Sequence, residues 1–164
     1  MNNIILRNFL VLSTATLFIC INAAWGGQAY VLKVLDGDSI QVKEGARIYD
    51  IRLYGVDAPE YDQHYGNRAR RFTSELIRRK NITVQAKYKD RYGRVVAVVM
   101  SQGKNVSKEL VRNGLAWVHP YFCKDKRQCS MMTQDQLAAK KAKLGLWKDA
   151  KPIPPWKWKK SRRR

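Results

Sequence analysis

The sequence predicts a single α+β domain, mainly β with helices, and this prediction rests on three observations. A chain of 164 residues has the length of one domain, and 45% hydrophobic residues are enough to form a buried core. Five short segments show the patterns of β-strands, and three others have apolar residues at helical spacing. Turn-forming residues separate these segments, so we expect short, closely connected elements.

The predicted strands begin with a hairpin. Segments 29–35 and 39–43 have strand patterns and flank an Asp-Gly-Asp turn at 36–38. A third strand is expected over 47–56, where apolar and polar residues alternate. It ends before Pro59, because proline has no N–H to donate to a neighbouring strand.

The remaining segments complete the order of elements. Asn105 and Gly114 are expected to begin and end the second helix, and Thr133 with Gln136 forms a capping-box pattern for the third. Three strands, one helix, two strands and two helices fit a small closed barrel of the oligonucleotide-binding type, the OB-fold. The predicted elements after the third strand are a helix over 67–79, strands over 82–88 and 94–100, and helices over 106–113 and 133–144.

Residues 1–26 have the pattern of a secretory signal peptide. One basic residue, Arg7, precedes a long apolar stretch that ends in small residues. We expect cleavage after Gly26, with Ala24 as the second choice, and export to the periplasm or the medium. The folded domain is then expected over 27–147, with no stable insertion in a membrane.

Two other roles for this segment stay open. A membrane anchor is one, because the uncharged run over 8–32 is long enough to span a bilayer. Polar residues and paired glycines in its second half favour cleavage instead. A lipid anchor at Cys20 is the other, although the bulky Ile19 stands where such a signal has a small residue.

The charge balance selects an acidic partner. Lys and Arg number 32 and Asp and Glu number 13, which gives a formal net charge of +19. Such a field attracts a polyanion and repels basic surfaces. Residues 148–164 are rich in Lys, Arg, Pro and Trp, so we expect a disordered basic extension in which Trp156 and Trp158 are candidates for stacking on bases.

The cysteine pattern excludes a zinc finger, since no C-x-x-C pair exists. Cys123 and Cys129 remain after signal removal and lie on a short polar segment. In an oxidising compartment they are able to form a disulfide, and two free thiols are the alternative.

Five side chains near predicted turns and strand ends have the chemistry of phosphodiester hydrolysis. Asp38 and Asp57 offer hard oxygen ligands, which suit Ca²⁺ or Mg²⁺. Arg52 and Arg94 suit a phosphate group, and Glu60 suits the activation of a water molecule. Each piece alone is also a common turn, loop or surface ion pair, so the residues by themselves leave both interpretations open.

The segments 34–60 and 90–99 closely resemble the staphylococcal nuclease (thermonuclease) family. They contain DGDSI at 36–40, RLYGVDAPE at 52–60 and DRYGR at 90–94, and 110–116 is similar to the family's second-helix region. The resemblance extends over roughly 29–147. It implies a five-stranded OB-fold barrel with three α-helices.

The resemblance also implies an activity and a site. It implies a Ca²⁺-dependent endonuclease that acts on DNA and RNA and leaves 3′-phosphates, and we expect a monomer. The implied metal ligands are the side chains of Asp38 and Asp57 and the carbonyl oxygen of Ala58. The implied catalytic residues are Arg52, Glu60 and Arg94, with Tyr92 beside the substrate.

Some positions depart from the family pattern. Ser39 and Ala58 replace threonines, and a main-chain ligand at Ala58 survives that change. A different segment, 117–122, follows the second helix, so Tyr121 is only a candidate for base stacking. His119 is a further candidate base, for which packing near Pro120 is the plainer expectation.

Two rival functions remain. The same barrel without catalysis would be a nucleic-acid-binding module, although all five reactive side chains are present. A cationic membrane-active protein would depend on the extension at 148–164.

Overall fold

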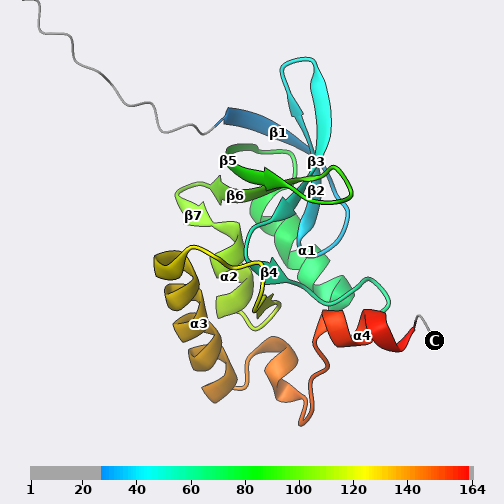
Figure 1. Cartoon of the computed structure of the whole chain (residues 1–164), viewed down its shortest axis with the longest axis vertical. Helices are drawn as coiled ribbons and strands as arrows, with labels where there is room; N and C mark the ends of the chain where they lie inside the picture. Colours follow the sequence, from blue (N-terminus) through cyan, green and yellow to red (C-terminus); the bar gives the residue numbers. More distant parts are fainter. Residues whose placement is uncertain (1–26, 163–164) are drawn as a thin grey trace, which may run out of the picture.

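A barrel of five strands forms the centre of the computed structural model, which describes residues 27–162; the expected signal peptide and Cys20 lie outside the described residues. The strands pair in the order β3-β2-β1-β5-β6, and a parallel pairing of β3 with β6 closes the barrel (Figure 1). The barrel strands are β1 (Gly27–Val34), β2 (Ser39–Glu44), β3 (Arg47–Leu53), β5 (Asn81–Lys89) and β6 (Val95–Ser101).

Short strands and helices surround the barrel. The pair of β4 (Val56–Asp57) with β8 (Trp117–Val118) forms a second small sheet, and β7 (Lys104–Asn105) extends the main sheet beside β6. In Figure 1 α2, α3 and α4 lie at the end of the molecule away from the β2–β3 hairpin. The helices are α1 (Gly66–Ile77), α2 (Val106–Arg112), α3 (Lys126–Lys141), the 3₁₀ turn η1 (Gly145–Lys148) and α4 (Pro155–Ser161).

The predicted α+β barrel is confirmed, with four α-helices in residues 27–162 where three were expected. Alternating residues of β2 and β3, such as Ile40 and Ile51, are fully buried in the barrel, as their pattern requires. Strand β6 is buried on both faces, because Val96 and Val98 pack outside the barrel against Tyr54. This explains its continuous apolar sequence.

The predicted start of the third helix at Thr133 is wrong. Helix α3 begins at Lys126, and its N-cap is Asp125, whose carboxylate accepts a hydrogen bond from the backbone N–H of Gln128 (3.0 Å). Thr133 donates instead to the carbonyl of Cys129, and Gln136 accepts from the N–H of Val118. The first turn of α3 is polar, so apolar spacing alone does not indicate where the helix begins.

The expectation of a disordered extension over 148–164 is also wrong within the described residues. Pro155, at the first helical position, begins α4 and is buried. The ring of Trp156 lies 5.1 Å from that of His119 and 6.4 Å from that of Trp117. Composition does not register such tertiary contacts. No helix among residues 27–162 has the length and hydropathy needed to cross a bilayer.

Tyr54 holds the segment before α3 against the barrel. Its ring is buried, and its hydroxyl accepts hydrogen bonds from the backbone N–H groups of Lys124 (2.8 Å) and Asp125 (2.9 Å). Cys123 and Cys129 form a disulfide across the start of α3. The sequence had left this pairing open.

His119 organises the same segment from its other end. Its ring nitrogen Nδ1 accepts hydrogen bonds from the N–H groups of Tyr121 (3.1 Å) and Phe122 (3.3 Å). Burial lowers the pKa of His119, so the imidazole is neutral near pH 7 and Nδ1 is able to accept. The histidine therefore has a structural role in this loop.

We expect Tyr54→Phe to destabilise the fold. The substitution keeps the ring but leaves two backbone N–H groups without their acceptor, a loss of about 1–3 kcal/mol in the free energy of unfolding. Urea unfolding under non-reducing conditions measures this loss. Tyr30→Phe, at an exposed position, is the control, and equal stability of the two variants would contradict the role of the hydroxyl.

His119 predicts a dependence of stability on pH. Because its folded pKa lies below the ordinary value of 6.5, the unfolded chain binds the proton first as pH falls. Stability is therefore lost from about that value downward through the lower folded pKa. Unfolding of the wild type and of His119→Gln between about pH 5 and 8 tests this. Parallel pH profiles for the two proteins would rule it out.

Candidate active site

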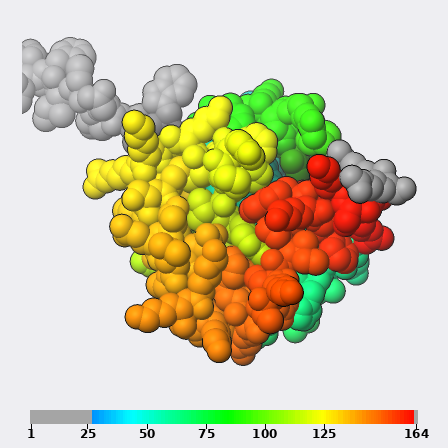
Figure 2. All heavy atoms as spheres, turned by 60° about the horizontal axis from the view of Figure 1, so that its bottom comes forward, coloured from blue at the N-terminus to red at the C-terminus, as the bar shows by residue number. Residues whose placement is uncertain are grey.

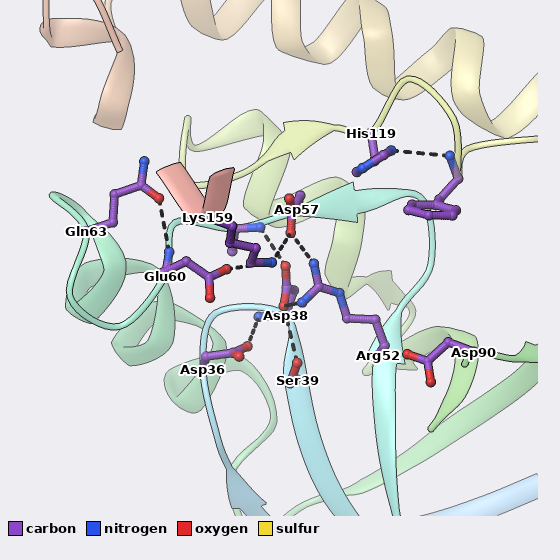
Figure 3. A network of polar contacts seen from close by, with 12 residues as sticks. Asp36, Asp38, Ser39, Arg52, Asp57, Glu60, Gln63, Asp90, His119 and Lys159 are labelled. Atoms are coloured by element: carbon purple, nitrogen blue, oxygen red, sulfur yellow. Dashed lines mark hydrogen bonds and ion pairs between the residues drawn. The ribbon is translucent and has the colours of Figure 1, made fainter. Parts of the chain in front are cut away.

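Arg52 joins two buried carboxylates that come from different turns. Its Nη1 lies 2.5 Å from Oδ1 of Asp38, and its Nη2 pairs with Oδ1 of Asp57 (Figure 3). Asp38 precedes β2, and Asp57 ends β4. The register of β2 on β3 pairs Ser39 with Arg52, which brings the guanidinium beside the neighbouring Asp38.

Burial and neighbouring charges act in opposite directions on this cluster. Burial alone would lower the pKa of Arg52, but Asp38 and Asp57 outweigh it and raise the pKa, so Arg52 stays charged. Burial raises the pKa of Asp38 well above its usual range; Arg52 opposes this, and Asp36 and Asp57 add to it. One guanidinium serves two buried carboxylates, so a further cation would be favourable here.

A tight turn places the predicted metal ligands side by side. The Asp38 N–H donates to Asp36 Oδ1 (2.9 Å), and Asp38 Oδ2 accepts from the N–H of Ala58 (2.6 Å). A Cβ at Gly37 would lie 2.7 Å from Cβ of Ala58 and 2.8 Å from Cβ of Ala69. Glycine is therefore required for the turn to reach both neighbours.

Glu60 is fixed at both its backbone and its side chain. Its N–H donates to Oε1 of Gln63 (3.2 Å), and its Oε1 lies 2.8 Å from Nζ of Lys159. The same Nζ lies 3.7 Å from Oδ1 of Asp57. Sequence reasoning missed Lys159, which belongs to α4; the proline at the start of that helix was the one local signal for it.

Arg94 and Tyr92 come from the turn between β5 and β6. Arg94 Nε donates to Asp90 Oδ2 (2.8 Å), and its Nη1 donates to Ser39 Oγ (3.4 Å). Burial would raise the pKa of Asp90, but hydrogen bonds from Arg94 and from the backbone of Tyr92 and Arg94 lower it. The ionised carboxylate thus orients the Arg94 guanidinium, which lies 5.5 Å from the Tyr92 ring centre.

One cavity of about 1120 Å³ collects these groups. Arg52, Glu60, Arg94 and Tyr92 all line it, together with residues of α4, whereas Asp38 and Ala58 are buried. Cationic donors and a carboxylate around one opening are able to bind a phosphodiester and to take a proton from water.

One other predicted residue does not take part in this cavity. Tyr121 is 78% exposed and is not part of the lining.

No group of three or more His, Cys, Asp or Glu side chains in the described part of the chain is arranged to hold a metal ion. The ligand set expected from the sequence has only two such side chains, Asp38 and Asp57, and the carbonyl oxygen of Ala58.

Comparison with known proteins gives the relatives of the chain. Residues 50–149 match the protein family described as staphylococcal nuclease homologue. An "Uncharacterized endonuclease" of Escherichia coli is 39% identical over 130 residues, which are 79% of this chain and 82% of that protein. A "Micrococcal nuclease" of Shigella flexneri is 33% identical over 159 residues, 91% and 90% of the two chains. A "Staphylococcal-like nuclease CAN1" of Arabidopsis thaliana is 34% identical over 118 residues, 72% of this chain and 35% of that protein.

The matched region contains the paired residues of β3 and β6 that close the barrel, the Arg52 to Glu60 segment and the turn that carries Arg94. The match therefore extends over most of the fold and over many of the residues that line the cavity, but not over α4. The resemblance noted in the sequence is confirmed: the chain belongs to the staphylococcal nuclease family.

Proposed function

We propose that the protein is an exported, monomeric, calcium-dependent endonuclease that hydrolyses DNA and RNA and leaves 3′-phosphates. The observation that carries this proposal is the meeting of Arg52, Glu60 and Arg94 at one cavity, with Asp38 and Asp57 beside Arg52. The names of the relatives, an endonuclease and a micrococcal nuclease, support the reaction class.

The proposed reaction uses the chain's own groups in two roles. Arg52 and Arg94 bind the non-bridging oxygens of the phosphate and stabilise the negative charge that grows there in the transition state. Glu60 accepts a proton from the water whose oxygen attacks phosphorus. The bond from phosphorus to the 5′ oxygen breaks, and that oxygen takes up a proton from solvent. The phosphate then stays on the 3′ oxygen.

The donor set fits calcium. Asp38 and Asp57 would hold it with carboxylate oxygens and Ala58 with its carbonyl, which are the hard ligands that this ion prefers. Burial raises the pKa of Asp38, and a bound cation would favour the ionised form of this carboxyl group. Bound calcium would supply positive charge to the phosphate oxygens.

The proposed export agrees with the disulfide. Cys123 and Cys129 are bonded, and disulfides persist in oxidising compartments such as the periplasm. The signal pattern of residues 1–26 belongs to the same proposal.

We expect purified residues 27–164 to cleave single-stranded DNA and RNA in Ca²⁺ and to stop when a chelator is added in excess. Gel analysis of labelled oligonucleotides, with calorimetric titration of Ca²⁺ onto the protein alone, measures both parts. Binding of DNA without cleavage in Ca²⁺ would favour the non-catalytic module. Full cleavage in chelator would remove calcium from the mechanism.

We expect Glu60→Gln to lower kcat at least about 100-fold, because the isosteric amide cannot accept the proton. Arg52→Lys should lower kcat by a similar factor, since an ammonium group cannot make the paired hydrogen bonds that a guanidinium makes to a phosphate group. Steady-state cleavage rates and circular dichroism separate chemistry from folding. Glu75→Gln, an exposed change on α1, is the control. A Glu60→Gln rate near that of the control would exclude Glu60 as the base.

A further inference from the structure

We propose that α4 forms one wall of the nucleic-acid site and that its Lys159 binds a substrate phosphate. This inference rests on the proposed function and adds to it a substrate-binding residue from the end of the chain. The cavity is lined on one side by Trp156, Lys159 and Lys160 of α4. The turn that carries Tyr92 and Arg94 contributes to the same lining, so a bound strand would lie between the two.

The surface view shows the same arrangement. In Figure 2 the C-terminal segment (red) lies on the surface next to the segment around residue 90 and beyond (green) and close to the loop around residue 120 (yellow). Phe122 of that loop also lines the cavity. Three stretches that are far apart in sequence therefore surround one opening, and the basic helix α4 is one of them.

Contacts outside the cavity hold α4 in place. Gln63 Nε2 donates to the carbonyl of Ile153 (2.5 Å), just before the helix, and Pro155 at its start is buried. Near its end, Trp158 Nε1 donates to Asp62 Oδ1 (3.3 Å), and Arg162 pairs with the same carboxylate. The position of Lys159 is thus set by the fold rather than by its ion pair with Glu60 alone.

Lys159 keeps donors for a substrate. An ammonium group has three N–H donors, and Glu60 at 2.8 Å takes one of them. Asp57 at 3.7 Å is too far for a hydrogen bond. The side chain is 39% exposed, so a phosphate oxygen is able to reach it from the cavity. It thus adds a cation held in place by the fold to Arg52 and Arg94 in the cavity lining.

A different role for the same contact is an inhibitory plug, in which Lys159 withholds Glu60 from water. The geometry points to the substrate role, because the Glu60 side chain stays 30% exposed and lines the open cavity beside Lys159. The plug predicts an effect of the opposite sign, which makes the two roles separable.

The test compares Lys159→Gln with Lys159→Arg and with Lys157→Gln, an exposed change on the same helix that lies outside the cavity lining. Anisotropy of a labelled single-stranded oligonucleotide, in excess chelator over a range of salt, measures binding. We expect Lys159→Gln to reduce the slope of log K against log salt by about 0.7, which is about fivefold weaker binding at 0.1 M salt. Lys159→Arg should keep the wild-type slope, and Lys157→Gln should leave it unchanged.

Cleavage in Ca²⁺ gives the second measurement, where Lys159→Gln is expected to raise KM by a similar factor. An unchanged slope for Lys159→Gln, or a loss no larger than that of Lys157→Gln, would overturn the proposal. Faster cleavage by Lys159→Gln would overturn it in favour of the plug. A wild type that binds the oligonucleotide but never cleaves it would defeat the proposed function, while the slopes still decide the role of Lys159.

Discussion

The buried ion cluster of Arg52 with Asp38 and Asp57 links the register of the barrel to the geometry of the site. A guanidinium and two carboxylates lie almost out of contact with water, and breaking such a pair by removing one partner costs about 3–5 kcal/mol. The barrel register and the short strand β4 must therefore bring three positions that are separate in sequence into contact. The pairing of these buried charges therefore stabilises the fold and also places Arg52, Asp38 and Asp57 together in the site.

The closure of the barrel extends this constraint to the second arginine. The parallel pairing of β3 with β6 sets Arg52 opposite Val96, so the turn before β6 must lie beside the start of β2. Arg94 then reaches Ser39, the neighbour of Asp38, with its guanidinium. Arg52 and Arg94 thus share one cavity because β3 pairs with β6, and local sequence patterns do not predict that pairing.

Local sequence patterns predict the elements whose formation depends on neighbouring residues in the chain. Alternating and continuous apolar patterns predicted the barrel strands, and the resemblance identified the segments around Arg52 and Arg94. The start of α3 escaped prediction because Asp125, Tyr54 and a disulfide determine it rather than apolar spacing. Helix α4 escaped because its order comes from partners such as Trp117 and Asp62, far away in the sequence. A basic, proline-rich composition resembles disorder unless those partners are known.

The charges of the site fall into two groups that respond differently to salt. The Arg52 cluster is buried, so dissolved ions screen it little, and it is expected to hold the site together over a wide range of ionic strength. The cations of α4 are half-exposed or exposed, and their attraction for a polyanion weakens as salt rises. Gln63 connects the groups, since it accepts from the Glu60 N–H and donates to the carbonyl of Ile153. The arrangement of the reacting groups is therefore insulated from the medium, while the capture of a substrate strand remains sensitive to it.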